Sequence, residues 1–185
     1  MTPAEYALHA RELLDVYTAL EDAAVALAGD PQVGPLLLAG LRRRTALLTD
    51  LEHFHGPHWR SELEYTRPLP ATRRYAERIR AVAPASPEHY VAHALVRCLA
   101  DLSAAEHAGR QAAEILGVER GAPGVAFYAY DGPDALRAQF QRLVDAVPWT
   151  EVQRRDLRDE LRVARRLSRE QDAELSRARR RMPTA

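Results

Sequence analysis

The chain has 185 residues, and its 26 Lys+Arg balance its 26 Asp+Glu, so its formal net charge is zero with the histidines neutral. That balance argues against a nucleic-acid-binding protein, which would carry a basic surplus, and the hydrophobic content of 46% argues against wholesale disorder. The single cysteine, Cys98, excludes an intramolecular disulfide and a cysteine-rich zinc site. We find no apolar run long enough to cross a membrane and no signal peptide, so we expect a cytoplasmic protein.

Helix signals divide the first half of the chain into three predicted helices. Thr2-Pro3-Ala4-Glu5 reads as a capping box, and apolar residues at helical spacing continue from it to the turn at Gly29-Asp30-Pro31. A second helix is predicted over residues 36–51, followed by a loop at 55–58. A third helix is predicted over about residues 71–83.

The second half of the chain predicts three further helices and one ordered loop. The first is long, opened by the cap and proline of Ser86-Pro87 and closed by Gly117. An ordered loop follows over residues 118–133, and Asp134 is then expected to cap a helix that ends at Val147. A capping box at Thr150 opens the last helix, whose end over residues 177–185 should fray. No segment alternates like a strand, so the predicted fold class is all-α.

Several segments, in order and without large gaps, carry a resemblance to a known family. They are Pro3-Ala4-Glu5-Tyr6, Tyr17-Thr18-Ala19-Leu20-Glu21, Gly56-Pro57-His58-Trp59-Arg60, Leu69-Pro70-Ala71-Thr72-Arg73-Arg74-Tyr75, Val91-Ala92-His93-Ala94-Leu95-Val96-Arg97-Cys98-Leu99-Ala100-Asp101-Leu102-Ser103 and Phe127-Tyr128. In this order they resemble the biliverdin-producing heme oxygenases over nearly the whole chain.

The resemblance implies one heme-oxygenase-like helical bundle over residues 1–185, with heme clamped between a proximal and a distal helix. The family reaction is oxidative cleavage of heme to biliverdin, carbon monoxide and iron. It consumes dioxygen and electrons from an external donor, so the resemblance also implies a redox partner. The protein supplies orientation and electrostatics, and heme supplies the chemistry.

The resemblance assigns roles or places to four residues. Asp101 matches the family's distal Asp, which holds a water network that delivers protons, and Arg97 matches an arginine of the same network. Ser103 falls in the family's Gly-Asp-Leu-Ser-Gly-Gly stretch, and Arg137 falls where the family has a basic residue for a heme propionate. From the residues alone, Asp101 could equally be a brace that pairs with Arg97 one turn earlier on the helix.

The chain also departs from the family pattern. The family's proximal histidine lies on a helix upstream of the segment that begins here at Pro3, so the expected domain lacks that helix, and no metal ligand is predicted. His9 falls on the following helix and does not replace the ligand. Alanines stand at three positions where the family has distal glycines: Ala100, Ala104 and Ala105. Polar or charged residues replace the family's residues at four further positions: Gln141, Arg165, Ser168 and Asp172. The three alanines imply a straighter helix whose methyl groups would displace or exclude heme.

These departures leave a second hypothesis of a different class. The chain would be a degenerate, non-catalytic heme-oxygenase-like protein that binds another tetrapyrrole, an apolar ligand or a partner protein. The vacant proximal face would then expose an apolar stripe and favour self-association. That stripe comprises Tyr6, Leu13, Tyr17 and Leu20 together with the distal stripe from Leu95 to Ala105.

Two metal-site alternatives and one thiol were also weighed. His53, His55 and His58 have a spacing that could bind zinc or nickel, but an ordinary polar loop beside Trp59 is the favoured interpretation. His89, His93 and Glu106 could contribute to a di-iron site, although no full ligand set is evident. Cys98 faces the predicted core and is interpreted as a small apolar filler.

Overall fold

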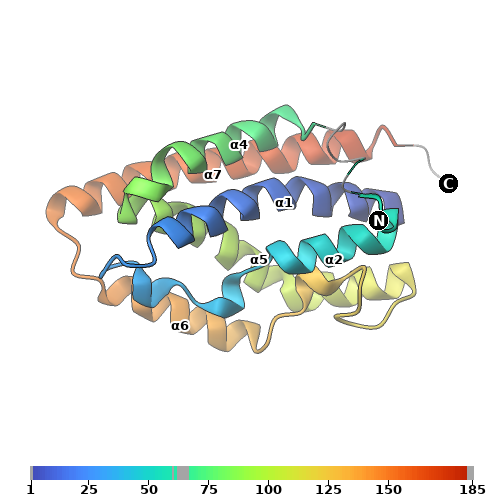
Figure 1. Ribbon diagram of the computed structural model, residues 1–185, viewed down its shortest axis with the longest axis horizontal. Coiled ribbons are helices and arrows are strands. Elements are labelled where there is room, and N and C mark those ends of the chain that lie inside the picture. Colours follow the sequence, from blue (N-terminus) through green and yellow to red (C-terminus); the bar gives the residue numbers. More distant parts are fainter. Residues whose placement is uncertain (1, 60, 62–66, 183–185) are drawn as a thin grey trace.

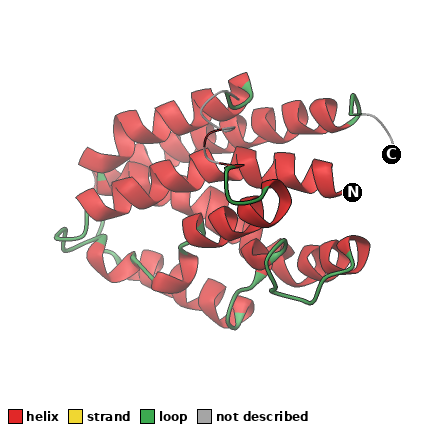
Figure 2. Cartoon of the chain, turned by 45° about the vertical axis from the view of Figure 1, so that its right-hand side comes forward, coloured by secondary structure: helices red, strands yellow, loops and turns green. Residues whose placement is uncertain are grey.

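The computed structural model describes residues 2–59, 61 and 67–182, and every regular element in these ranges is helical (Figure 2). The all-α prediction is therefore confirmed. The α-helices are α1 (Pro3–Ala26), α2 (Arg44–His55), α4 (Pro70–Val82), α5 (Pro87–Leu116), α6 (Pro133–Ala146) and α7 (Glu151–Arg179). The short 3-10 turns are η1 (Gly34–Leu36), η2 (Ala39–Leu41), η3 (Ala83–Ala85) and η4 (Ala126–Tyr128).

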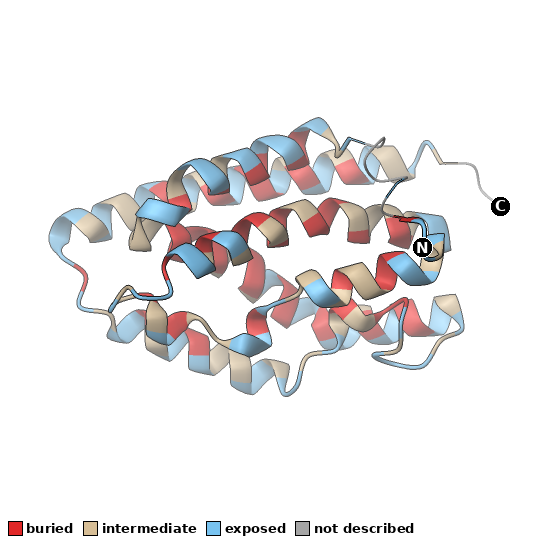
Figure 3. Cartoon of the chain, viewed as in Figure 1, coloured by how far each residue is buried: buried red, intermediate tan, exposed pale blue. Residues whose placement is uncertain are grey.

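Helix α1 lies at the centre of the bundle (Figure 1). It packs against α2 and α4, while α7 packs against α4 and α5, and α6 packs against the other side of α5. Buried residues run along most of α1 (Figure 3). The long helix α5 is therefore flanked by α6 and α7.

Local capping explains where three of the helices begin. The capping box at the start of α1 is present, since Thr2 Oγ1 accepts the Glu5 N–H and Glu5 accepts the Thr2 N–H. A second capping box joins Thr150 to Gln153 at the start of α7. Ser86 Oγ caps α5, and Gly117 closes that helix with a left-handed φ of 66°. These predictions are confirmed.

The second helix begins later than predicted. Residues 34–41 form two short 3-10 turns, and α2 starts at Arg44 rather than at residue 36. The reason is a contact from another helix: Glu21 Oε1 on α1 accepts the N–H groups of Arg43 and Arg44 at 2.8 and 2.7 Å. A carboxylate at the helix N-terminus satisfies two unpaired donors, and this fixes the start of α2.

One smaller prediction, about the start of α6, is wrong. Gly132, not Asp134, is the N-cap of α6, and Pro133 is its first residue. The last helix continues to Arg179, past the point where fraying was expected, because Leu175 is buried and Arg179 is half-buried. The final stretch of the expected frayed tail, residues 183–185, lies outside the described residues.

The apolar stripe expected to be open on α1 is in fact part of the core. Tyr6, Leu13, Tyr17 and Leu20 are all buried, each 4% exposed or less. Neighbouring helices cover them, so the prediction of an exposed stripe is wrong for α1. Part of the distal stripe on α5 does reach the surface: Leu95 and Leu99 are half-buried and Ala100 is exposed.

Candidate functional site

A buried carboxylate is the centre of the candidate site. Tyr17 donates its hydroxyl to Asp101 Oδ2 at 2.7 Å, and Arg97 Nε donates to the same oxygen at 2.7 Å. Arg97 Nη2 donates to Oδ1, which makes the Arg97–Asp101 contact bidentate. Asp101 is 6% exposed and Arg97 is 7% exposed, so the ion pair lies within the bundle. The structure thus brings together the two residues predicted for proton delivery.

The electrostatics of this cluster favour an ionised pair and a neutral phenol. Burial and the neighbouring Asp101 carboxylate raise the pKa of Tyr17 well above its usual value, so Tyr17 acts as a donor. Burial opposes the charge on Arg97, but Asp101 outweighs burial and raises the pKa of Arg97. Arg97 Nη1 and the Tyr75 hydroxyl are buried without a hydrogen-bond partner among the described residues. Buried donors of this kind are typical of places where ordered water binds.

Sequence reasoning missed Tyr17 as a member of this cluster. It lies 84 residues from Asp101 in sequence, and its hydroxyl reaches Asp101 from α1. The signal that could have found it is a tyrosine within an apolar helical stripe, because a buried phenol needs a hydrogen-bond partner.

A groove on α5, beside α7, is lined by two of the other predicted residues, Ala100 and Ser103. It has a volume of about 420 Å³ and is lined by Leu95, Val96, Leu99, Ala100, Ser103, Leu161 and Arg165. Ala104 is exposed on the same helix. Arg137 of α6 reaches this surface, since its Nη1 donates to Ser103 Oγ at 3.2 Å. Leu95 also lines an adjoining groove of about 490 Å³ with Gln141 and Arg142.

Ala105 does not share the face that Ala100 and Ala104 occupy. It is 2% exposed and lines a different hollow, together with Gly109 and Tyr128. At Gly109 an added Cβ would lie 2.8 Å from Tyr128 Cβ, so the loop that carries Tyr128 packs directly on the backbone of α5. Two of the three alanines, not three, therefore present methyl groups on the exposed surface of α5.

His9 of α1 lies against Phe127 and Tyr128 and is uncharged. Burial, with the positive charges of Arg179 and Arg97, lowers the pKa of His9 to about 3. Its Nδ1 is buried without a hydrogen-bond partner among the described residues, and its Nε2 is 3.5 Å from the Tyr128 hydroxyl.

The metal-site alternatives find no support in the geometry. In the part of the chain that the structure describes, no group of three or more His, Cys, Asp or Glu side chains is arranged to hold a metal ion. His53 packs against Phe54, with ring centroids 5.1 Å apart. His93 instead bonds Glu160 Oε1 at 2.9 Å, and Glu106 is exposed and pairs with Arg110.

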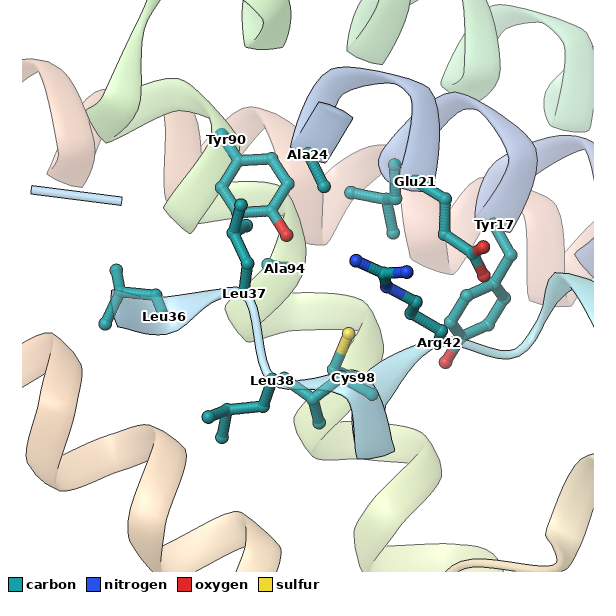
Figure 4. Close-up of a pocket in the computed structure, with 12 residues that line it drawn as sticks. Tyr17, Glu21, Ala24, Leu36, Leu37, Leu38, Arg42, Tyr90, Ala94 and Cys98 are labelled. Carbon is teal, nitrogen blue, oxygen red and sulfur yellow. The ribbon is translucent and has the colours of Figure 1, made fainter. Parts of the chain in front are cut away.

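Cys98 faces a small cavity behind the cluster (Figure 4). The cavity, of about 30 Å³, is lined by residues of α1, α5 and the 34–42 segment, including Tyr17, Glu21 and Arg42. It has room for a water molecule but not for a larger ligand. Burial and the nearby Asp101 raise the pKa of the Cys98 thiol to about 12, as expected for an inert core residue.

The fold and site define an all-helical, heme-oxygenase-like protein. The heme oxygenase family model matches residues 1–169. A heme oxygenase from Takifugu rubripes is 34% identical over 158 residues, which cover 83% of this chain and 56% of that protein. The chain therefore belongs to the heme oxygenase family, although it spans about half the length of the curated relatives it matches.

Solved structures agree with this family assignment. The heme oxygenase of Leptospira interrogans superposes with a TM-score of 0.82 at 25% identity, covering 94% of this chain and 84% of that one. Heme oxygenase-1 of Synechocystis sp. PCC 6803, in complex with heme, gives a TM-score of 0.79 at 25% identity, covering 96% of this chain and 81% of that one. Among the described residues, no helix of this chain is long and apolar enough to cross a bilayer.

Proposed function

We propose that this chain binds heme against the α5 groove and takes part in its oxidative cleavage to biliverdin, carbon monoxide and iron. One observation carries the proposal. The buried Arg97–Asp101 pair, which Tyr17 of α1 contacts, lies on the same turns of α5 as the exposed residues Ala100 and Ala104. A proton-holding group thus lies beside a surface on which a flat ligand could rest.

The residues that line the groove fit such a ligand in part. Leu95, Val96, Leu99 and Leu161 provide an apolar floor that would bury ring surface, and Arg137 offers a guanidinium for a propionate. None of the chain's seven histidines lines this groove. Heme, when bound, would supply the iron centre at which dioxygen is reduced by electrons from an external donor. We expect hemin bound to this 185-residue chain to lack histidine ligation.

The roles of the chain's own residues follow from their hydrogen bonds. Asp101 is an acceptor whose two oxygens are held by Arg97 and Tyr17. Arg97 Nη1 has no partner among the described residues, so it can bind a water molecule next to the carboxylate. Asp101 would orient that water and hold or release a proton, and Tyr17 would keep the carboxylate in place.

The second candidate, a non-catalytic member of the family, is favoured by a specific observation. Both oxygens of Asp101 are already occupied by the side chains of Arg97 and Tyr17. A carboxylate bound in this way can brace α5 against α1 without any chemistry. In that case the α5 groove would bind another tetrapyrrole or a partner, and no biliverdin would form.

A hemin titration followed by turnover separates the two candidates. The probe is hemin, with ascorbate as the reductant and the visible spectrum of biliverdin as the readout. Asp101→Asn should keep hemin affinity and slow biliverdin formation by about a hundredfold, as expected for the loss of a proton-transfer group. Asp159→Asn, at an exposed partner of Arg162, is the control and should change neither measurement.

Either of two results would contradict the proposal. Hemin binding without biliverdin formation by the wild-type chain would support the non-catalytic candidate. Equal turnover by the wild type and Asp101→Asn would remove Asp101 from the mechanism.

A further inference from the structure

A second guanidinium faces the α5 groove, from the side opposite Arg137. Arg165 of α7 lines the groove together with Ala100 and Ser103 of α5. Arg137 of α6 reaches the same Ser103 with a hydrogen bond of 3.2 Å. Helices α6 and α7 both pack on α5 and lie on different sides of it (Figure 1), so the two guanidiniums approach Ser103 from different helices.

Arg165 lacks the ion pair that Arg162 and Arg166 each make on the same helix. Arg162 pairs with Asp159 at 2.5 Å, and Arg166 lies 4.0 Å from Glu170, so both are engaged on the outer side of the helix. Arg165 makes no hydrogen bond or ion pair with any residue that the structure describes. No acidic side chain of the described residues lines the groove, so the positive charge there is not neutralised within the chain.

The shape and charge of the groove identify the class of ligand. The floor of the groove is apolar at Leu99 and Leu161. The side chains of Ala100 and Ser103 are small, so a flat ring system could lie close to the α5 backbone. A guanidinium at each side matches a ligand with two separate carboxylates, because guanidinium binds carboxylate with two parallel hydrogen bonds.

We propose that Arg165 is a carboxylate-binding, specificity-determining residue of this groove, and that it acts with Arg137 on the two carboxylates of a flat amphipathic dicarboxylate. This inference rests on the proposed function, in which the ligand is a tetrapyrrole and the carboxylates are its propionates. Arg165 then selects the free acid over its neutral esters. The site is exposed, so salt should weaken the contribution of Arg165.

The test compares hemin with hemin dimethyl ester, in which both carboxylates are blocked. Arg165→Ala, Arg165→Lys and the matched control Arg166→Ala are each titrated with both probes at low and at high salt. Arg165 is exposed, so the variants should fold, and circular dichroism checks this. We expect Arg165→Ala to weaken hemin binding about tenfold at low salt, Arg165→Lys to restore part of it, and the ester to bind all proteins alike.

The outcomes separate this inference from the proposed function. If the wild-type chain binds neither probe, the proposed function fails and the inference fails with it. If hemin binds the wild type and Arg165→Ala equally, or if Arg165→Ala weakens the ester as much as hemin, then Arg165 does not bind a carboxylate and only the inference is overturned. A loss in Arg166→Ala as large as that in Arg165→Ala would show a general charge effect and would also overturn it.

Discussion

Replacing Glu160 with Gln should destabilise the bundle more than any other conservative change on α7. Glu160 is 3% exposed and joins three helices: it accepts from His93 of α5 at 2.9 Å and from Arg78 Nε of α4 at 2.9 Å. Burial alone would raise the pKa of Glu160, but the hydrogen bonds from His93 and Arg78 outweigh burial and lower it from 4.5 to about 2. At about 1.4 kcal/mol for each pKa unit, the ionised carboxylate contributes about 3 kcal/mol to stability.

The pH dependence follows from the direction of that pKa change. A carboxylate with a lowered pKa stabilises the folded state fully above about pH 4.5, and this contribution is lost as the pH falls towards 2. Glu160→Gln keeps the shape but removes the charge, and its amide NH2 group would face a donor of either His93 or Arg78. Urea unfolding followed by circular dichroism should show a loss of about 3 kcal/mol at neutral pH and a smaller difference in acid.

The control is Glu170→Gln on the same helix. Glu170 pairs with Arg74 at 3.2 Å, but its side chain is 41% exposed, so its loss should cost less than about 1 kcal/mol. Two results would refute the reasoning: equal losses for the two variants, or a difference between wild type and Glu160→Gln that does not shrink in acid.

Two further variants test how the loop over residues 118–132 is held. Asp50→Asn should lower the free energy of unfolding by about 2–4 kcal/mol and speed hydrogen exchange at Gly124 and Phe127. The reason is that the buried carboxylate accepts three backbone N–H groups of that loop. Unchanged exchange would contradict this. Gly109→Ala would ordinarily stabilise a helix, but here the new Cβ would lie 2.8 Å from Tyr128 Cβ, so we expect a loss of about 1–3 kcal/mol in thermal unfolding. Gly29→Ala, where nothing lies within 4 Å, is its control, and equal melting of the two variants would contradict the clash.

The helix starts that the sequence predicted correctly are those whose caps are local. Thr2, Ser86 and Thr150 each bond an N–H three residues ahead, so the signal lies within four letters of sequence. The start of α2 is set instead by Glu21, 22 residues before Arg43 in the chain. No local pattern contains that contact, and this is why the predicted boundary was wrong.

The candidate site likewise contains contacts that are local in sequence and contacts that join different helices. The Arg97–Asp101 pair has the i,i+4 spacing of one helix face, so it could be proposed from the sequence. The contacts of Tyr17 with Asp101 and of Arg137 with Ser103 join different helices, and only the packing of α1 and α6 on α5 shows them. The family resemblance named Arg137 and Ser103 as separate members of the site but did not pair them.

The three alanines of α5 are neighbours in sequence but do not share one face of the helix. Ala100, Ala104 and Ala105 fall within two turns, and in sequence they look like one change to one surface. In the structure, Ala105 is 2% exposed and faces the Tyr128 loop, while Ala100 and Ala104 are exposed on the groove side. A ligand on the groove would meet two added methyl groups on an open surface that α6 and α7 flank but do not cover. Only two of the three alanines can therefore add methyl groups where heme would rest. The close contact between α5 and the Tyr128 loop falls at Gly109.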